Sequence, residues 1–242
     1  MKKIKAVLIT RSEPRHTYFA NFLSKHVDLL SVFVHESKRK KISLRSAWKR
    51  IISLLSRRST KEARHFFKKS KVEHAIADKV FRVSDINDES FVDKLLSTEP
   101  EMIFTFGCGV IKNEKYFSSK LDIVNLHSGL IPDYRGVDSV YWCIYNKEFE
   151  KIGFTIHVID KRLDMGKIIA SDTLKEKIGC CESKVFFDVI SAAISKYPGI
   201  IQDFSSGRKL SLSIPHENNK IYYEKDRSIL TDLVVCRNLL FK

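Results

Sequence analysis

The sequence LDIVNLHSGLIPDYRG, residues 121–136, joins an apolar run to a turn and carries two polar side chains at the junction. Asn125 and His127 lie two positions apart, which in a β-strand places both side chains on one face. The Pro-Asp-Tyr-Arg-Gly sequence that follows, at 132–136, indicates a turn. Two neighbouring polar groups at the end of a strand indicate a site, although a surface loop that contains a histidine explains the same residues.

Outward from this stretch, apolar runs typical of strands alternate with helical patterns. The predicted strands occupy residues 3–10, 29–35, 101–107, 121–127, 151–160 and 167–174. The predicted helices include one after the first strand and others at 88–100, 137–146 and roughly 182–197. This alternation predicts an α/β fold with a doubly wound, mostly parallel sheet. Ligands of such sheets bind beyond the carboxyl ends of the strands, which selects the loops after 107, 127 and 160.

The length of 242 residues suits one α/β domain with a modest appendage. We predict a main domain over 1–178, with a basic helical insertion at about 38–71. Residues 179–242 are predicted to form a small α+β extension with a helix, a strand pair (KLSLSI and KIYYE) and a terminal amphipathic helix.

Composition excludes several classes of protein. No apolar run reaches the roughly 18 residues that span a bilayer, and the N-terminal KAVLIT is typical of a strand rather than a signal peptide. The five cysteines are odd in number and include no C-x-x-C, which excludes a disulfide framework and a zinc knuckle. We therefore expect a cytoplasmic protein with reduced cysteines.

The net charge of +14 is concentrated in one segment. Residues 38–71 hold 14 Lys and Arg and a single acid, Glu62, whereas the rest of the chain is close to neutral. Within this segment Trp48, Ile51, Ile52 and Leu55 follow helical spacing opposite basic residues. Three uses stay open: a helix packed on its own domain, an anionic membrane surface, or a nucleic acid.

The polar residues of the selected loops suit a transfer without a covalent intermediate. Asn125 offers an amide donor for a developing oxyanion, and His127 offers a donor or a proton shuttle. Asp164 is placed to orient His127 or to take a proton. Ser128 lacks the G-x-S-x-G elbow of a nucleophile, and no third ligand accompanies His127 and His157, so no metal site is predicted. For His157, a core role and a role beside the site both stay open.

The sequence FGCGVI, residues 106–111, contains two glycines that permit close approach of a flat ligand to the backbone. A simple turn explains the glycines equally well. Neither a G-x-G-x-x-G nor a P-loop sequence is present, so these two kinds of nucleotide site are not supported.

Three ordered motifs together resemble one enzyme family. The sequence NLHSGLIPDYRG resembles the signature of the formyltransferases that use 10-formyltetrahydrofolate, GFTIHVIDKRLDMGKII resembles their second signature, and FTFGCGVI resembles their pterin loop. Order and spacing agree over roughly 100–172, although Gly129 and Ile131 stand where the family more often has Ser and Leu. The resemblance implies a formyltransferase-type Rossmann-like fold and 10-formyltetrahydrofolate as the formyl donor.

Carried over residue by residue, the resemblance implies that Asn125, His127 and Asp164 are catalytic. Amine attack on the formyl carbon would give an oxyanion held by Asn125 and His127, while Asp164 orders His127. The implied pterin contacts come from the two loops around it: Phe106, Gly107, Cys108, Gly109, Val110, Ile111 and Asp160. Further residues are expected to contact the substrate: Arg11, Arg15, His16, Tyr134, Arg135 and Gly136.

The substrate expected from the resemblance is a nucleotide-linked amino sugar used in cell-surface glycan synthesis, such as O-antigen or lipopolysaccharide. The first strand ends in TRSEPRH without a glycine-rich phosphate loop, and about 65 residues after 175 are too few for the second domain of the tRNA enzyme. A methionyl-tRNA formyltransferase-like enzyme and a non-catalytic basic binding module stay as alternatives. We also predict a homodimer, a possible membrane contact through 38–71, and no nucleic-acid partner.

Overall fold

The computed structural model describes residues 3–36, 58–68, 75–175, 178–179, 181–207, 212–216 and 220–241. The chain divides into two compact units, Met1–Ile123 and Val124–Lys242. Most of the predicted basic helical insertion at 38–71 lies outside the described residues. The exception is the helix α3 (Arg58–Phe67), which packs on α1 (Pro14–His26).

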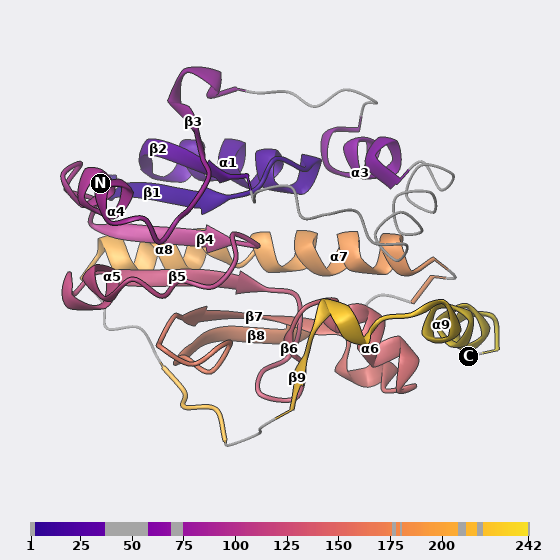
Figure 1. Ribbon diagram of the computed structural model, residues 1–242. Coiled ribbons are helices and arrows are strands. Elements are labelled where there is room, and N and C mark those ends of the chain that lie inside the picture. The colour runs from indigo at the N-terminus through magenta and orange to yellow at the C-terminus, as the bar shows by residue number, and fades with distance from the viewer. Residues whose placement is uncertain are drawn as a thin grey trace. The chain divides into compact units, whose positions relative to one another are not determined.

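The first unit contains four parallel strands (Figure 1): β1 (Lys5–Thr10), β2 (Asp28–His35), β3 (Val80–Val83) and β4 (Met102–Phe106). They pair in the order β3-β2-β1-β4. Every residue of β4 and the last five of β1 are buried, as expected for strands covered on both faces. The predicted parallel sheet therefore holds in this unit.

Short helices complete the first unit: η1 (Ala77–Lys79), α4 (Glu89–Leu96) and α5 (Glu114–Ser118). Asp88 caps α4 by accepting from the Phe91 N–H, and Asn113 caps α5 by accepting from the Lys115 N–H. These caps fix where the chain turns on either side of β4.

The second unit begins within β5 (Asp122–His127), which pairs antiparallel with β7 (Gly153–Val158), and β7 pairs antiparallel with β8 (Ile168–Thr173). The main sheet has the strand order β3-β2-β1-β4-β5-β7-β8. The second unit also contains the helices α6 (Ser139–Tyr145), η2 (Phe149–Lys151), α7 (Glu182–Ile194), α8 (Tyr197–Ser205), η3 (Glu224–Asp226) and α9 (Ile229–Leu240). The predicted fold class, a mostly parallel sheet flanked by helices, is confirmed.

Two details differ from the sequence prediction. The helix predicted over roughly 182–197 is α7, which ends at Ile194. A further helix that the sequence did not predict, α8, follows it, with Pro198 in its first turn, where the missing N–H costs nothing. The predicted strand pair in the tail does not form among the described residues. Instead β9 (Ile221–Tyr222) pairs in parallel with β6 (Arg135–Gly136), and Ser213 makes an isolated bridge to Ile168.

The terminal helix α9 lies beside α6 in the second unit (Figure 1). Asn238 donates from Nδ2 to the carbonyl oxygens of Ile144 and Tyr145, both at 3.0 Å, and so satisfies two groups at the end of α6. Tyr141 donates from its hydroxyl to Thr231 Oγ1 at 2.6 Å. These contacts fix α9 on one side of the helix that follows the HSGLIPDYRG turn.

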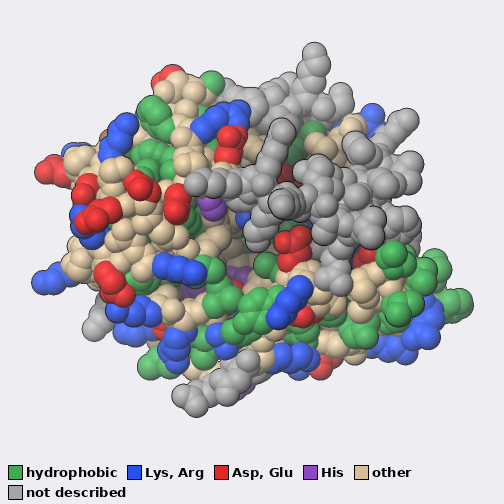
Figure 2. All heavy atoms as spheres, in the orientation of Figure 1, with side chains coloured by type: hydrophobic (Ala, Val, Ile, Leu, Met, Phe, Trp, Pro, Cys, Tyr) green, Lys and Arg blue, Asp and Glu red, His purple; other side chains and the backbone are tan. Residues whose placement is uncertain are grey.

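The opposite side of α9 is apolar and exposed, as the green spheres at that end of the molecule in Figure 2 show. Leu230, Leu233 and Leu240 are between 62 % and 74 % exposed. Among the described residues, no helix has the length and hydropathy that a bilayer crossing requires.

Candidate active site

The β5–β7 pairing places the catalytic candidates opposite two polar residues. Asn125 faces His157 and His127 faces Thr155 across the two strands. Directly opposed residues on antiparallel strands lie on the same face, so these four side chains share one surface. The loop after β7 then returns Asp164, whose backbone takes a positive φ of 47°. Asn125, His127 and Asp164 thus meet within the second unit.

His127 is fixed at both ring nitrogens. Its Nε2 lies 2.7 Å from the carbonyl oxygen of Tyr134, and because a carbonyl only accepts, Nε2 carries a proton. Its Nδ1 lies 3.6 Å from Oδ2 of Asp164. In the neutral ring, Nδ1 is therefore the unprotonated nitrogen, and a proton gained there faces a carboxylate.

Asn125 is oriented through His157. The Asn125 Nδ2 donates to His157 Nε2 at 3.1 Å, and His157 Nδ1 lies 3.2 Å from the Val158 carbonyl oxygen. His157 Nε2 is also 3.6 Å from Asp164 Oδ1, so a protonated His157 would face the same carboxylate as His127. His157, left open by the sequence, is buried and belongs to this cluster.

Asp164 stays ionised between these groups. Burial by itself would raise the pKa of this carboxyl, but the neighbouring His127, His157 and the Gly136 N–H together outweigh burial and hold the pKa well below its ordinary value. The Gly136 N–H donates to Oδ2 at 2.8 Å. The result is a fixed negative charge beside His127 Nδ1.

Ser139 approaches His127 without being a nucleophile. Its Oγ lies 3.3 Å from His127 Nε2, but it also donates to the Tyr134 carbonyl oxygen at 3.1 Å. Because Nε2 already carries a proton, it has no capacity to accept one from Ser139. The side chain is only 1 % exposed, so it offers no surface to a substrate. Ser139 is therefore a structural contact of the turn and not a nucleophile.

Thr155 and Gly129 shape the turn that follows β5. Thr155 Oγ1 donates to the Gly129 carbonyl oxygen at 2.8 Å and accepts from the Ile131 N–H at 3.1 Å. A Cβ at position 129 would lie 2.6 Å from both the Ser139 Cβ and the Tyr134 carbonyl oxygen. The space beside Gly129 is thus filled by Ser139, which explains why this position has no side chain.

The predicted pterin loop belongs to the first unit and presents mainly backbone. Gly107 and Gly109 are exposed with positive φ angles of 61° and 101°, whereas Phe106, Cys108 and Ile111 are buried. Burial raises the pKa of the Cys108 thiol to about 12, so it stays protonated. Val110 supplies an exposed apolar side chain. A flat ligand that reads backbone groups fits this surface, because no Cβ stands at either glycine.

Two side chains hold this loop from within the first unit. His35 at the end of β2 lies 2.5 Å from the Cys108 carbonyl oxygen through Nδ1. Asn87 donates to the Val110 carbonyl oxygen at 3.0 Å and accepts from the Lys112 N–H at 2.6 Å and the Asn113 N–H at 3.2 Å. Neither His35 nor Asn87 carries a motif in the sequence that would predict this role.

In the second unit, Asp160 closes a turn by accepting from the Arg162 N–H at 2.8 Å, and its carboxylate also pairs with the Arg162 guanidinium at 3.1 Å. Its expected contact with the pterin stays a prediction.

The substrate contacts expected near the first strand separate into an exposed and an internal group. Arg11 is exposed directly after β1. Arg15 pairs with Glu62 at 2.8 Å, and His16 is buried against Thr10, with Nδ1 2.7 Å from the threonine Oγ1. Burial and the charges of Arg15 and Arg11 lower the pKa of His16 well below its ordinary value, so this ring is neutral. Only Arg11 of the three has an exposed side chain.

Tyr134, Arg135 and Gly136 contact the catalytic candidates His127 and Asp164 and the loop before Asp164. The Tyr134 carbonyl accepts from His127, the Gly136 N–H donates to Asp164, and Arg135 Nε donates to the Leu163 carbonyl oxygen at 2.8 Å. The side chains of Tyr134 and Arg135 are 1 % and 6 % exposed. Their described contacts are to the protein, and contact with a substrate stays a prediction.

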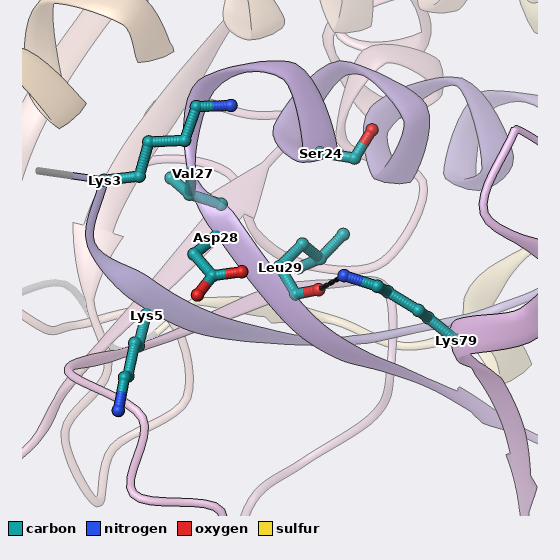
Figure 3. A pocket seen from close by; sticks show the side chains of 7 residues that line it. All are labelled: Lys3, Lys5, Ser24, Val27, Asp28, Leu29 and Lys79. Atoms are coloured by element: carbon teal, nitrogen blue, oxygen red, sulfur yellow. Dashed lines mark hydrogen bonds between the residues drawn. The ribbon is translucent and has the colours of Figure 1, made fainter.

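A cavity of about 380 Å³ in the first unit lies elsewhere (Figure 3). It opens where β1 and β2 begin, and its cationic lining residues are Lys3, Lys5 and Lys79. Lys3 and Lys79 donate to the backbone carbonyls of Lys25 and Leu29. Because ligands of doubly wound sheets bind at the opposite, carboxyl ends of the strands, this cavity is not the candidate active site. No cluster of metal-ligating side chains occurs in the portion of the chain that the structure describes.

Comparison with known families tests the resemblance to the formyltransferases. A family model described as formyl transferase matches residues 18–178. The chain belongs to the formyl transferase family. The predicted resemblance is thereby confirmed, and with it the expectation of an enzyme class whose formyl donor is a formyl-tetrahydrofolate.

Individual formyl transferases match parts of the chain. A GDP-perosamine N-formyltransferase of Brucella melitensis is 32 % identical over 117 residues, covering 48 % of this chain and 43 % of that protein. A methionyl-tRNA formyltransferase of Chlorobium chlorochromatii is 34 % identical over 90 residues, covering 37 % of this chain and 28 % of that protein. The chain thus spans less than half the length of these two relatives.

Among solved structures, the sugar 3N-formyltransferase WlaRD superposes with a TM-score of 0.63 at 18 % identity, covering 99 % of this chain and 80 % of WlaRD. That structure was determined in the presence of dTDP and 5-N-formyl-tetrahydrofolate. At this identity the likeness concerns the fold.

Proposed function

We propose that this formyl transferase moves the formyl group of 10-formyltetrahydrofolate to the amino group of a nucleotide-linked amino sugar, in the synthesis of a cell-surface glycan such as O-antigen or lipopolysaccharide. The observation that carries the proposal is the state of His127. One nitrogen is committed to the Tyr134 carbonyl and the other faces the ionised Asp164. This arrangement provides an acid–base group without an accessible nucleophile.

Such a site suits direct transfer between two bound substrates. The donor supplies a formyl carbon that the neutral amine attacks, so that a C–N bond to the sugar forms and the bond to the donor nitrogen breaks. His127 takes the amine proton at Nδ1, where Asp164 stabilises the resulting imidazolium. The Asn125 amide would donate an N–H to the formyl oxygen, on which negative charge develops. The positive charge of the protonated His127 would stabilise the same oxygen. The proton then returns to the nitrogen of the leaving tetrahydrofolate.

The donor would contact the exposed backbone of Gly107 and Gly109 in the first unit. This assignment is supported by the positive φ angles and the missing side chains at both glycines. Arg11, at the carboxyl end of β1, is the exposed cation that we propose for the diphosphate.

The sugar acceptor is supported by the relatives that formylate sugars and by the extent of the WlaRD superposition. A transfer RNA acceptor is the second candidate, because methionyl-tRNA formyltransferases also match and residues 38–71 are strongly basic.

The same basic residues are proposed to contact an anionic membrane surface. A second copy of the chain is the proposed protein partner, and the cytoplasm the proposed compartment.

A screen of nucleotide-linked amino sugars with 10-formyltetrahydrofolate tests the proposal. Mass spectrometry should detect the gain of one formyl group on at least one sugar, and Asp164→Asn should abolish the gain. Charged initiator methionyl-tRNA is the parallel substrate. Formylation of the tRNA with none of any sugar would overturn the sugar assignment, and no transfer to either would favour the non-catalytic binding module.

A further inference from the structure

Residues 134–137 lie between the catalytic pair and the C-terminal strand β9. On the catalytic side, the Tyr134 carbonyl oxygen accepts from His127 Nε2 at 2.7 Å, and the Gly136 N–H donates to Asp164 Oδ2 at 2.8 Å. Both catalytic side chains are therefore held by backbone groups of this four-residue segment. Whatever fixes the segment fixes the atoms of His127 and Asp164.

On the opposite side, the backbone of Tyr222 holds the same segment. Gly136 is paired with Tyr222 in the β6–β9 ladder, and the Val137 N–H donates to the Tyr222 carbonyl oxygen at 3.0 Å. The approach is so close that a Cβ at Gly136 would lie 2.2 Å from that oxygen. Gly136, with a φ of 92°, is the residue that permits this contact.

The Tyr222 ring packs on one side chain of the same segment, Tyr134, and on Trp142 of α6. It stacks on Tyr134 with ring centroids 5.5 Å apart and 5° between the planes, and on Trp142 at 4.9 Å and 19°. Asn146 Nδ2 donates to the hydroxyls of both Tyr134 and Tyr222 at 3.0 Å. The ring is 7 % exposed, so it is a packed element of the second unit rather than a surface group.

We infer that Tyr222 is a positioning residue for the catalytic pair, acting through Tyr134 on His127 and through Gly136 on Asp164. The inference rests on the proposed function for its catalytic consequence. Tyr222 lies beyond residues 18–178, the part of the chain that the family model matches. The tail thus contributes to the active site without contacting a reacting atom.

The direct test is the protonation pattern of His127 in the protein without ligands. Histidine-selective ¹⁵N NMR over a pH series, with His127→Gln to assign the signal, should show the neutral ring as the Nε2–H form in the wild type. Tyr222→Phe keeps the ring and loses only the hydroxyl that accepts from Asn146, so this variant should show the same Nε2–H form as the wild type. Tyr222→Ala should give a mixture of both neutral forms, because the Tyr134 carbonyl is no longer held in place.

Two controls separate positioning from lost stability. Tyr223→Ala truncates the adjacent, exposed tyrosine, and Val235→Ala removes buried volume from α9. Both should keep the wild-type His127 pattern. If Tyr222→Ala does not fold, two other variants replace it. Tyr222→Leu removes the ring stack on Tyr134, and Gly136→Ala disturbs the backbone contact with Tyr222, so both should give the mixture. A folded Tyr222→Ala or Tyr222→Leu with the wild-type pattern would overturn the inference.

Kinetics supply the second readout, with the acceptor found in the screen. Tyr222→Ala should lower kcat by ~10-fold or more, the scale for a misplaced acid–base group, while KM for 10-formyltetrahydrofolate stays within about twofold. An unchanged kcat would contradict the inference. Since NMR needs no substrate, a failed screen with a changed His127 pattern would reject the proposed function and keep the positioning role.

Discussion

His127 carries a proton at Nε2, which donates to the Tyr134 carbonyl oxygen, and its Nδ1 faces the Asp164 carboxylate. This division of roles between the two ring nitrogens is what a proton-transfer group requires, because only one of them needs to change state during turnover. Asp164 stays ionised beside the Nδ1 of His127, and His157 orients the Asn125 amide by accepting a hydrogen bond from it.

Substitutions of the three site residues should separate chemistry from folding at this cluster. His127→Gln, Asp164→Asn and Asn125→Ala should each lower kcat by ~10²-fold or more, the scale for a lost acid–base group or oxyanion donor. Steady-state kinetics with the acceptor from the screen measure the effect, and circular dichroism checks the fold. Near-normal turnover in two of the three variants would contradict the mechanism.

The lowered pKa of Asp164 should appear in the pH dependence of stability. A carboxyl whose pKa is lower in the folded than in the unfolded chain binds fewer protons when folded, so its stabilising contribution is complete at neutral pH. That contribution should decrease as the pH falls through the ordinary value of 3.8 and vanish below the folded-state pKa.

Denaturant unfolding at pH 7 and at successively lower pH, on wild type and Asp164→Asn, measures this contribution. The difference in unfolding free energy between the two proteins should shrink toward acid. A difference that is constant with pH would show that Asp164 is not held ionised by its neighbours.

The packing at Gly129 predicts a steric effect on both stability and activity. In Gly129→Ala the new Cβ would meet the Tyr134 carbonyl oxygen and Ser139 at 2.6 Å, so both must move. We expect a loss of about 1–3 kcal/mol in unfolding free energy, the usual cost of overpacking, and a fall in kcat because Tyr134 holds His127.

Gly199→Ala is the matched control for this substitution. No atom lies within 4 Å of a Cβ at Gly199, which is in helix α8, so this change should be neutral or slightly stabilising. The double variant Gly129→Ala/Ser139→Gly removes one of the two collisions and should recover part of the lost stability. Equal thermal unfolding of the two alanine variants would refute the packing argument.

At the scale of elements, the loop after β4 depends on Asn87, which bonds three backbone groups between Val110 and Asn113. Gly109 already adopts a φ of 101°, so a side chain at that position strains the loop itself. Asn87 is therefore the better probe of whether loop shape governs donor binding.

Asn87→Ala should weaken the affinity for 5-formyltetrahydrofolate by ~10-fold, the scale of one to two lost hydrogen bonds to a fixed loop. Isothermal titration calorimetry measures this affinity. Asp88→Ala is the control, since it removes the cap of α4 next door and keeps the hydrogen bonds that Asn87 makes to the loop. An unchanged affinity in Asn87→Ala would place donor binding away from residues 106–111.

At the scale of the whole molecule, the charge is unevenly distributed. Residues 38–71 carry 14 of the 43 basic residues, and their only acid, Glu62, is buried against Arg15. Such a concentration of charge produces a field that attracts any polyanion. The sequence left three roles open for this segment: packing on its own domain, contact with an anionic membrane, and contact with a nucleic acid. Binding measurements distinguish these roles.

Reversing Lys38, Arg39, Lys40 and Lys41 to Glu should leave turnover on a soluble nucleotide sugar within about twofold. The same variant should lose most of its binding to vesicles of anionic phospholipid at low salt, because it removes much of the local attraction. Co-sedimentation measures binding, with neutral phosphatidylcholine vesicles as the control. Loss of turnover would instead place these charges at the substrate, and wild-type vesicle binding would reject the membrane role.

The sequence by itself determined the alternation of strands and helices and the positions of Asn125, His127 and Asp164, because period-two and helical patterns and local motifs are written in neighbouring residues. The structure confirms the fold class and places these three side chains together. The end of α7 was also local: the helix predicted over roughly 182–197 stops before Pro198, which stands in the first turn of the next helix, α8.

Only the tertiary structure decided which distant residues surround the candidate catalytic side chains. His157, Ser139 and Tyr222 are separated from His127 by between 12 and 95 positions, and no local pattern records their contacts. The pairing of β9 with β6 rather than with its neighbour in the tail has the same cause. Register and ring stacking depend on which distant surfaces pack together, and that is set by the burial of the whole unit rather than by any short stretch of sequence.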